Sequence, residues 1–322
     1  MNALVTGITG FVGTHLAEHL LATGDVVAGV SRHEPSESTK SASPEGRRRE
    51  FSATVSPSSR SSSPQARFAW DLARHDAAPA LVVAVDSFAP DVIYHLAAAS
   101  IPVDCGGRGD PTPAAWRTNV EGTRRVLELA AALRRPPRVV LFSSSHVYGG
   151  VDASSPPVAE SALAVPRSAY GRTKLAAEVL GAVAAASRGL DVVVVRSFLL
   201  AGAGQDGRLM LPEWAVQFAR GGEGPVEVVG LDVRLDLLDV RDAVRAFRLV
   251  ALHGASGGTY NVGSGRGLSS GTVFEALRRV AGVDRPVREL RPGRRYEPIA
   301  DVTRLGNLGP WSPEVPIGRA HV

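Results

Sequence analysis

The sequence has only one cysteine, Cys105, among 322 residues. A single thiol cannot build a disulfide framework or a thiolate metal site, so we expect no bound metal and a reducing compartment. The sequence also lacks any apolar run near the roughly 20 residues that a membrane span requires. A strand predicted to begin at Ala3 leaves no room for a signal peptide. We therefore expect a cytoplasmic protein with no membrane partner.

The sequence also has no large excess of one charge: it contains 36 basic and 32 acidic residues, and the net charge is +4. Aromatic residues make up only 6% of the chain, and the one run of three basic residues, Arg47–Arg49, lies in a Ser-rich stretch. Nucleic-acid binding surfaces need a basic stripe with interleaved aromatic residues. The composition therefore argues against a nucleic-acid partner.

Apolar strands alternate with helical patterns along the first two thirds of the chain. Such alternation is typical of a parallel sheet covered by helices on both faces, which is the doubly wound α/β Rossmann fold. We predict strands at 3–6, 26–30, 68–70, 91–95, 139–142, 192–195 and 259–262, and helices from residue 11, at 78–88, 114–133, 170–186 and 239–252.

The chain divides into a large unit and a smaller one. We predict that residues 1–196 form the NAD(P)-binding Rossmann domain and that 235–262 return to it. The Gly- and Pro-rich segments 197–234 and 263–322 would form a substrate-binding lobe. Residues 33–66 are rich in Ser, Pro, Glu and Arg and nearly lack large apolar side chains, which predicts a mobile surface insertion.

A glycine-rich turn joins the first predicted strand to the first helix. Gly7, Gly10 and Gly13 lie in the segment Thr6-Gly-Ile-Thr-Gly-Phe-Val-Gly13, together with Thr9, Phe11 and Val12. Glycines let the backbone approach a pyrophosphate, and the helix N-terminus offers free N–H groups. This strand–turn–helix context predicts a dinucleotide site. The alternative is a tight turn that binds no ligand.

The second predicted strand ends at Ser31-Arg32. An NAD-selective site usually has a carboxylate there to bind the ribose 2′-hydroxyl, whereas an arginine attracts the 2′-phosphate of NADP. The absence of an acid favours NADP. The alternative, in which Arg32 only stacks on the adenine, suits NAD as well.

A phenol, an ammonium group and a hydroxyl form the predicted catalytic set. Tyr170 and Lys174 lie one helical turn apart on the same face, and Ser144 ends a predicted strand. A nearby cation favours the ionised phenol, which helps it to exchange a proton near neutral pH. Alone, a Tyr-x-x-x-Lys pair is common on any helix. Here the pair is informative because it follows, in this order along the chain, the glycine turn and the serine at the end of a strand.

These motifs together resemble the extended short-chain dehydrogenases/reductases, the NAD-dependent epimerase/dehydratase family. The resemblance covers nearly the whole chain outside residues 33–66 and assigns catalysis to Ser144, Tyr170 and Lys174. It implies that the cofactor is bound by the glycine turn and by Ser31, Arg32, Asp71, Leu72, Leu96, Ala97, Ala98, Asn119, Tyr170 and Lys174.

The C-terminal third is similar to the substrate lobe of GDP-4-keto-6-deoxymannose reductases. This similarity implies that Arg234 holds the substrate diphosphate, with a second arginine that is either Arg294 or Arg295. Ser145, His146 and Leu199 occupy the other substrate positions that the resemblance implies, although Leu199 replaces an amide of the family and would also suit a core position. His146 replaces the glutamate of dehydratases, which argues against elimination chemistry.

We therefore expect reduction of the 4-keto group of a nucleoside diphosphate (NDP)-linked 4-keto-6-deoxyhexose, with NADPH and with Tyr170 as proton donor. The nearest alternative is an NDP-sugar 4-epimerase that retains NAD. A non-catalytic NADP-binding regulator on the same fold is the alternative of a different class. The resemblance also implies a homodimer formed through the helices predicted at 114–133 and 170–186.

Overall fold

A parallel sheet lies at the centre of the protein, whose computed structural model describes residues 1–32, 64–222 and 224–316. Its strands within those residues are β1 (Asn2–Thr6), β2 (Val26–Ser31), β3 (Ala66–Ala69), β4 (Val92–His95), β5 (Arg138–Ser144), β6 (Val192–Ser197) and β10 (Thr259–Val262). They pair in the order β10-β6-β5-β4-β1-β2-β3, and every pairing is parallel. The α/β Rossmann fold is confirmed.

Helices cover both faces of this sheet, and that explains the apolar strands. Helices α1 (Phe11–Ala22) and α7 (Val240–His253) pack against one face. Helices α2 (Pro79–Phe88), α4 (Gly122–Ala132) and α5 (Ala169–Arg188) pack against the other. Along β1, Val5 belongs to the first core and Leu4 to the second. Because alternate residues point to opposite faces, a strand buried on both sides needs an unbroken apolar run.

The helix predicted at 114–133 is not one continuous α-helix. A short turn, α3 (Pro113–Trp116), leads into a π-helical turn, η2 (Arg117–Glu121), and then into α4. A π-turn accommodates one extra residue and often lies at a functional site. It places Asn119, only 1% exposed, toward the inside of the protein. The periodicity of the sequence could not predict this π-helical turn, because the turn depends on what the Asn119 side chain binds.

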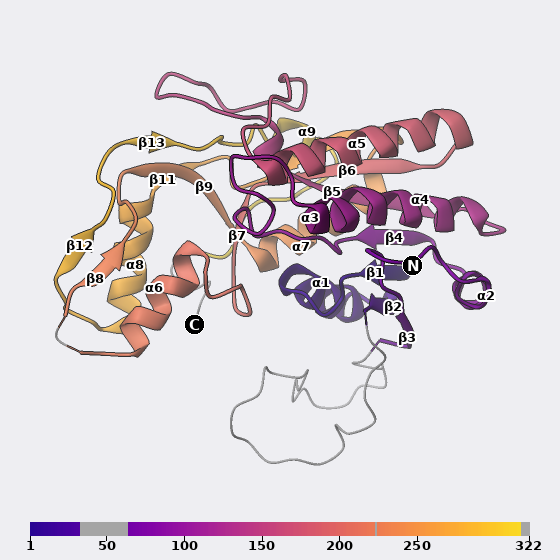
Figure 1. Ribbon diagram of the computed structural model, residues 1–322, viewed down its shortest axis with the longest axis horizontal. Helices are drawn as coiled ribbons and strands as arrows, with labels where there is room; N and C mark the ends of the chain where they lie inside the picture. The colour runs from indigo at the N-terminus through magenta and orange to yellow at the C-terminus, as the bar shows by residue number, and fades with distance from the viewer. Residues whose placement is uncertain (33–63, 223, 317–322) are drawn as a thin grey trace, which may run out of the picture.

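A smaller unit lies to one side of the main sheet, at the left of Figure 1. Its elements are β7 (Leu199–Ala201), α6 (Met210–Ala219), β8 (Val226–Val228), β9 (Val233–Asp239), β11 (Gly267–Ser269), α8 (Ser270–Ala281), β12 (Val287–Glu289) and β13 (Arg295–Tyr296). The short α9 (Thr303–Gly306) follows them in the chain but packs near β10 of the main sheet. Trp214, Phe218, Leu235 and Phe274 lie in the unit's own core.

The division into two units stays a proposal. The strand pairing changes one of its boundaries, the residue at which the chain returns to the main sheet. Residues 235–239 end β9, which pairs with β7, β11 and β13 in the smaller sheet. The return to the main sheet therefore begins at Val240 with α7 and is completed by β10. Most of the insertion predicted at 33–66 lies outside the described residues, although Ala66 already belongs to β3.

The described residues show neither a membrane-spanning helix nor a metal centre. No helix among them is both long enough and apolar enough to cross a bilayer. They also contain no group of three or more His, Cys, Asp or Glu side chains placed to hold a metal ion.

Candidate active site

The glycine turn has a geometry that only glycine permits. Gly7 has a φ of +72°, and a Cβ there would lie 2.8 Å from the backbone nitrogen of Ala97. A Cβ on Gly13 would lie 2.2 Å from the carbonyl oxygen of Gly7. The turn is therefore pressed against both α1 and the segment after β4. A cradle this tight leaves the N–H groups of Phe11 and Val12, in the first turn of α1, open to an anion.

The sheet order places a ligand crevice beside this turn. β1 pairs with β2 on one side and with β4 on the other, so the segments that follow β1 and β4 diverge at the carboxyl edge of the sheet. Doubly wound sheets bind their ligands at such a switch point. The predicted cofactor residues Leu96, Ala97 and Ala98 follow β4 at this edge, and the glycine turn follows β1.

Buried hydrogen bonds tie the two sides of the crevice together. His95 Nδ1 lies 2.8 Å from Thr6 Oγ1, and His95 Nε2 lies 3.0 Å from Thr123 Oγ1. Thr123 Oγ1 donates to the carbonyl oxygen of Asn119, so it accepts from Nε2–H and leaves Nδ1 as an acceptor. The backbone N–H of Ala97 donates to Thr6 Oγ1. Burial lowers the pKa of His95 to about 3, so the ring is neutral.

Sequence reasoning did not assign Thr6, His95 or Thr123 to the site. The available signal was weak: Thr6 and His95 are polar residues at the ends of apolar strands, whereas Thr123 lies beside two arginines on α4. Which partners they have depends on three elements meeting, and no spacing along the chain shows that.

Asn119 is held at the other wall of the crevice. Its Oδ1 accepts from the N–H of Ala99 (2.7 Å), and its Nδ2 donates to the Ala99 carbonyl oxygen (2.9 Å). Nδ2 also donates to Thr173 Oγ1 on α5 (2.9 Å). Asn119 therefore connects the segment after β4 to the helix that carries Tyr170 and Lys174.

The predicted adenine end of the site is assembled from β2 and β3. Ser31 at the end of β2 is aligned with Ala69 at the end of β3, so Arg32 and Asp71 both follow neighbouring strand ends. Asp71 accepts from the N–H of Ala73 (3.0 Å) and lies 3.4 Å from Arg74. Leu72 is buried and lies against the start of α4 at Gly122.

Ser144, Tyr170 and Lys174 converge in the structure. Ser144 ends β5, while Tyr170 and Lys174 lie in the first two turns of α5, which Ser168 caps by accepting from the N–H of Gly171. The Ser144 hydroxyl lies near the Tyr170 phenol and acts to lower its pKa. Lys174 Nζ lies 5.9 Å from the centre of the Tyr170 ring and donates to the carbonyl oxygen of Phe142 (2.9 Å).

Burial determines the charge of both groups. It raises the pKa of Tyr170, against a smaller lowering by the Ser144 hydroxyl, so the phenol stays protonated at neutral pH. Burial lowers the pKa of the Lys174 ammonium to about 8. A protonated phenol next to a cation is suited to deliver a proton to a developing alkoxide.

His146 contacts both hydroxyl-bearing residues. Its backbone N–H donates to Ser144 Oγ (3.3 Å), and its ring packs edge-on against Tyr170 with 5.5 Å between ring centres. Its Nδ1 lies 3.3 Å from Ser168 Oγ, and burial lowers the pKa of the imidazole. Ser145 beside it is buried. The position that carries a glutamate in dehydratases therefore holds a neutral ring.

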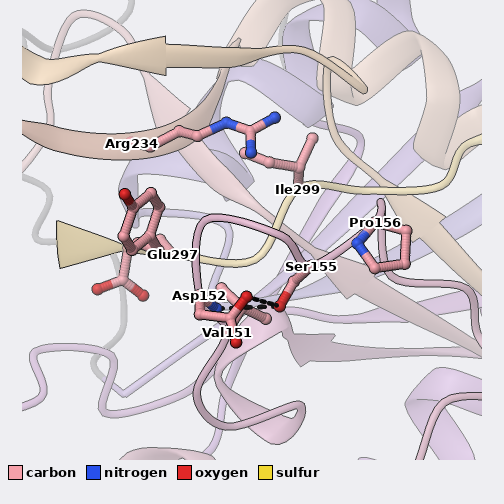
Figure 2. A pocket seen from close by; sticks show the side chains of 8 residues that line it. Val151, Asp152, Ser155, Pro156, Arg234, Glu297 and Ile299 are labelled. Carbon is pink, nitrogen blue, oxygen red and sulfur yellow. Dashed lines mark hydrogen bonds between the residues drawn. The ribbon is translucent and has the colours of Figure 1, made fainter.

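Arg234 lines a small pocket between the lobe and the loop of residues 151–156 (Figure 2). The pocket is lined by Val151, Asp152, Ser155, Pro156, Arg234, Tyr296, Glu297 and Ile299. The Arg234 guanidinium is half-buried and makes no hydrogen bond or ion pair with any residue that the structure describes. An unpaired arginine suits the binding of a diphosphate.

Strand alternation separates Arg294 from Arg295. In the register of β13 against β9, Tyr296 is opposite Arg234 and Arg295 is opposite Val233. Arg295 therefore points away from Arg234, and its guanidinium lies over Gly230. Arg294 pairs with Asp232 (2.8 Å) and lies near Tyr296, which lines the Arg234 pocket. Leu199 packs on the core of the lobe, as the alternative for that residue expected.

Comparison with known proteins gives one family. The model of the NAD dependent epimerase/dehydratase family matches residues 3–263. The GDP-6-deoxy-D-mannose reductase of Pseudomonas aeruginosa is 30% identical over 71% of this chain and 77% of its own. The UDP-glucose 4-epimerase of Streptomyces lividans is 30% identical over 96% of this chain and 91% of its own.

A solved structure agrees with these matches. The structure of RMD from Pseudomonas aeruginosa complexed with NADPH superimposes with a TM-score of 0.76 and 26% identity, covering 99% of this chain and 96% of that one. The similarity therefore extends through both the main sheet and the smaller unit.

Proposed function

Because the chain belongs to the NAD-dependent epimerase/dehydratase family, we propose that it reduces the 4-keto group of an NDP-4-keto-6-deoxyhexose. The observation that carries this proposal is the protonated Tyr170, which lies near Ser144 and next to Lys174. The neutral His146 at the position of the dehydratase glutamate supports reduction over elimination, as does the likeness to a 6-deoxy-mannose reductase.

The catalytic residues each have a separate task. When bound, the nicotinamide supplies the hydride for the carbonyl carbon. Ser144 donates a hydrogen bond to the carbonyl oxygen and orients it. Tyr170 transfers its proton to that oxygen as negative charge develops on it, which leaves an alcohol and a phenolate. Lys174 stabilises the phenolate until solvent returns the proton.

The cofactor proposed is NADP. The glycine cradle at Gly7 and Gly13 and the open N-terminus of α1 fit a pyrophosphate. At the adenine end, Arg32 follows Ser31 with no carboxylate at the end of β2, which suits a 2′-phosphate. Thr9, Phe11, Val12, Asp71, Leu72, Leu96, Ala97, Ala98 and Asn119 would complete the cofactor site, with Tyr170 and Lys174 at the nicotinamide ribose.

On the substrate side, Arg234 would bind the diphosphate, assisted by Arg294. The alternation of side chains along β13 favours Arg294 over Arg295. Arg294 lies near Tyr296, which lines the pocket of Arg234, whereas Arg295 points to the other face of the strand. Ser145 and His146 would contact the sugar. We assign Leu199 to the lobe core rather than to the substrate.

An NDP-sugar 4-epimerase is the second candidate, since a UDP-glucose 4-epimerase matches nearly the full length of the chain. The two reactions differ in their redox balance. A reductase consumes one NADPH for each sugar reduced, whereas an epimerase inverts C4 and leaves its NAD unchanged overall.

We expect the purified protein to oxidise NADPH in the presence of a 4-keto-6-deoxy sugar nucleotide, and to oxidise NADPH faster than it oxidises NADH. The decay of absorbance at 340 nm measures this directly, with GDP-, UDP- and dTDP-linked sugars compared in parallel. Inversion of a 4-hydroxy sugar nucleotide without any added cofactor, detected by chromatography, would show the epimerase instead.

We also propose a homodimer formed through α4 and α5. On α5, Val179 and Val183 are 55% and 56% exposed, two apolar side chains one turn apart on the outer face. Replacing both by Glu should convert a dimer to a monomer in sedimentation experiments, because two buried carboxylates would face each other across the symmetry axis. A wild-type protein that sediments as a monomer would contradict the proposal.

A further inference from the structure

The segment between β7 and α6, residues 202–208, crosses from one wall of the cofactor crevice to the other. In Figure 1 it runs from β7 down to the near end of α1 before it rejoins the lobe at α6. Most of its residues are exposed on their outer side, whereas Gly202 is buried beneath. We call residues 202–208 the strap.

The strap is held at two places, which we call its fastenings. The first is a set of contacts with α1, directly after the glycine turn. A Cβ on Gly202 would lie 3.1 Å from the ring of Phe11 and 2.5 Å from Val240, so the backbone is pressed onto both. His15, one turn further along α1, donates from Nε2 to the carbonyl oxygen of Ala203 (2.9 Å). The strap therefore passes over the helix end that would hold the pyrophosphate.

The second fastening is an ion pair on the opposite wall. Arg208 Nη1 donates to both carboxylate oxygens of Asp104, at 3.1 and 3.0 Å. Asp206 within the strap accepts from Nε and Nη2 of the same guanidinium, both at 3.0 Å, and so orients it. Asp104 precedes Cys105, which belongs to the buried cluster that Tyr170 packs against.

Between these two contacts the strap contains a glycine in the left-handed region and an unpaired polar atom. Gly204 has a φ of +86° with open space where a Cβ would be. The amide of Gln205 donates to the carbonyl oxygen of Leu200 (2.8 Å), while its Oε1 is buried without a partner among the described residues. A buried acceptor normally has a donor. A hydroxyl or amide of a bound ligand would supply it.

We propose that the strap closes over the bound nicotinamide cofactor and that release of the Arg208–Asp104 pair is the opening step of cofactor exchange. This inference rests on the proposed function, because a reductase must exchange its cofactor in every turnover. The His15 contact is a short hydrogen bond to an uncharged carbonyl oxygen, whereas the ion pair is half-exposed, with side chains 56% and 50% accessible. An exposed ion pair contributes little and is weakened by salt, so this end opens first.

The test measures the dissociation rate of NADPH, without any sugar substrate. The enzyme is loaded with NADPH, mixed rapidly with excess NADP, and followed by the loss of bound-NADPH fluorescence. Asp104→Ala should raise the dissociation rate about two- to fivefold, the range expected for one exposed ion pair. High salt should accelerate release from the wild type more than from the variant, because the contacts of the cofactor phosphates are screened equally in both.

A matched control is available in the lobe. The Arg288–Glu227 pair, at 3.3 Å, has side chains 64% and 48% exposed and lies away from the crevice. Glu227→Ala should leave the dissociation rate unchanged. The charge swap that combines Asp104→Arg with Arg208→Asp should bring the rate back toward the wild-type value, and a loss of folding in Asp104→Ala alone would not be corrected in that way.

The outcomes separate this inference from the function on which it rests. Tight NADPH binding with the same dissociation rate in wild type, Asp104→Ala and the control would overturn the strap and leave the reductase proposal intact. An equal acceleration in Asp104→Ala and Glu227→Ala would also overturn it. Failure to bind either NADPH or NADH would overturn both proposals together.

Discussion

Replacing Tyr170 by Phe should lower kcat by roughly 10²- to 10⁴-fold, the usual contribution of a positioned general acid. The change removes one oxygen atom and keeps the ring, so the edge contact with His146 and the packing on Cys105 remain. Steady-state oxidation of NADPH with a 4-keto sugar nucleotide measures the loss.

The same variant should keep its cofactor and its fold. NADPH fluorescence titration and the thermal midpoint serve as controls, because neither depends on the proton transfer. A Tyr170→Phe protein that turns over at the wild-type rate would remove Tyr170 from the mechanism.

Replacing Lys174 by Met should also lower kcat, by about 10²-fold or more, because it removes a preorganised charge next to the phenol. Burial lowers the pKa of Lys174 to about 8, so wild-type kcat should fall as pH rises through that value and the ammonium is lost. The variant should lack this alkaline limb. If kcat of Lys174→Met falls at alkaline pH in the same way as that of the wild type, the fall is caused by the ionisation of another group.

Lys174 also connects catalysis to stability. Its pKa is near 10.5 when unfolded and about 8 when folded, so between these values the unfolded chain binds the extra proton. The free energy of unfolding of the cofactor-free protein should therefore rise with pH across this window, by about 3 kcal/mol in total. Below pH 8 the full cost of burying the ammonium applies.

Denaturant titrations of wild type and Lys174→Met check this linkage. The difference in unfolding free energy between the two proteins should change steadily between pH 8 and pH 10.5 and be constant at lower pH. A difference that does not depend on pH would mean that Lys174 has an ordinary pKa in the folded protein.

The fold was predictable because its signals are local. Val-rich strands such as β6 must be buried on both faces, and glycines at 7, 10 and 13 mark a turn at which side chains clash. The proposed catalytic set was predictable for a similar reason. Tyr170 and Lys174 are one helical turn apart, so their proximity needs no tertiary information.

Other features depend on distant segments that meet, and the chain carried only weak signs of them. The π-turn at Asn119 depends on Ala99 and Thr173, and the orientation of His95 depends on Thr6 and Thr123. A spacing that is regular along one helix cannot show such partners.

The amino-acid order alone determined the alternation of strands and helices, the glycine turn and the Tyr–Lys pair, because each arises from contacts within a few residues. Only the tertiary structure shows that Arg295 lies on the strand face opposite to Arg234, since that depends on how β13 aligns with β9. It also brought Arg208 to Asp104 across the crevice. Pairings between segments far apart in the chain are decided by how the whole fold packs, and local pattern does not encode them.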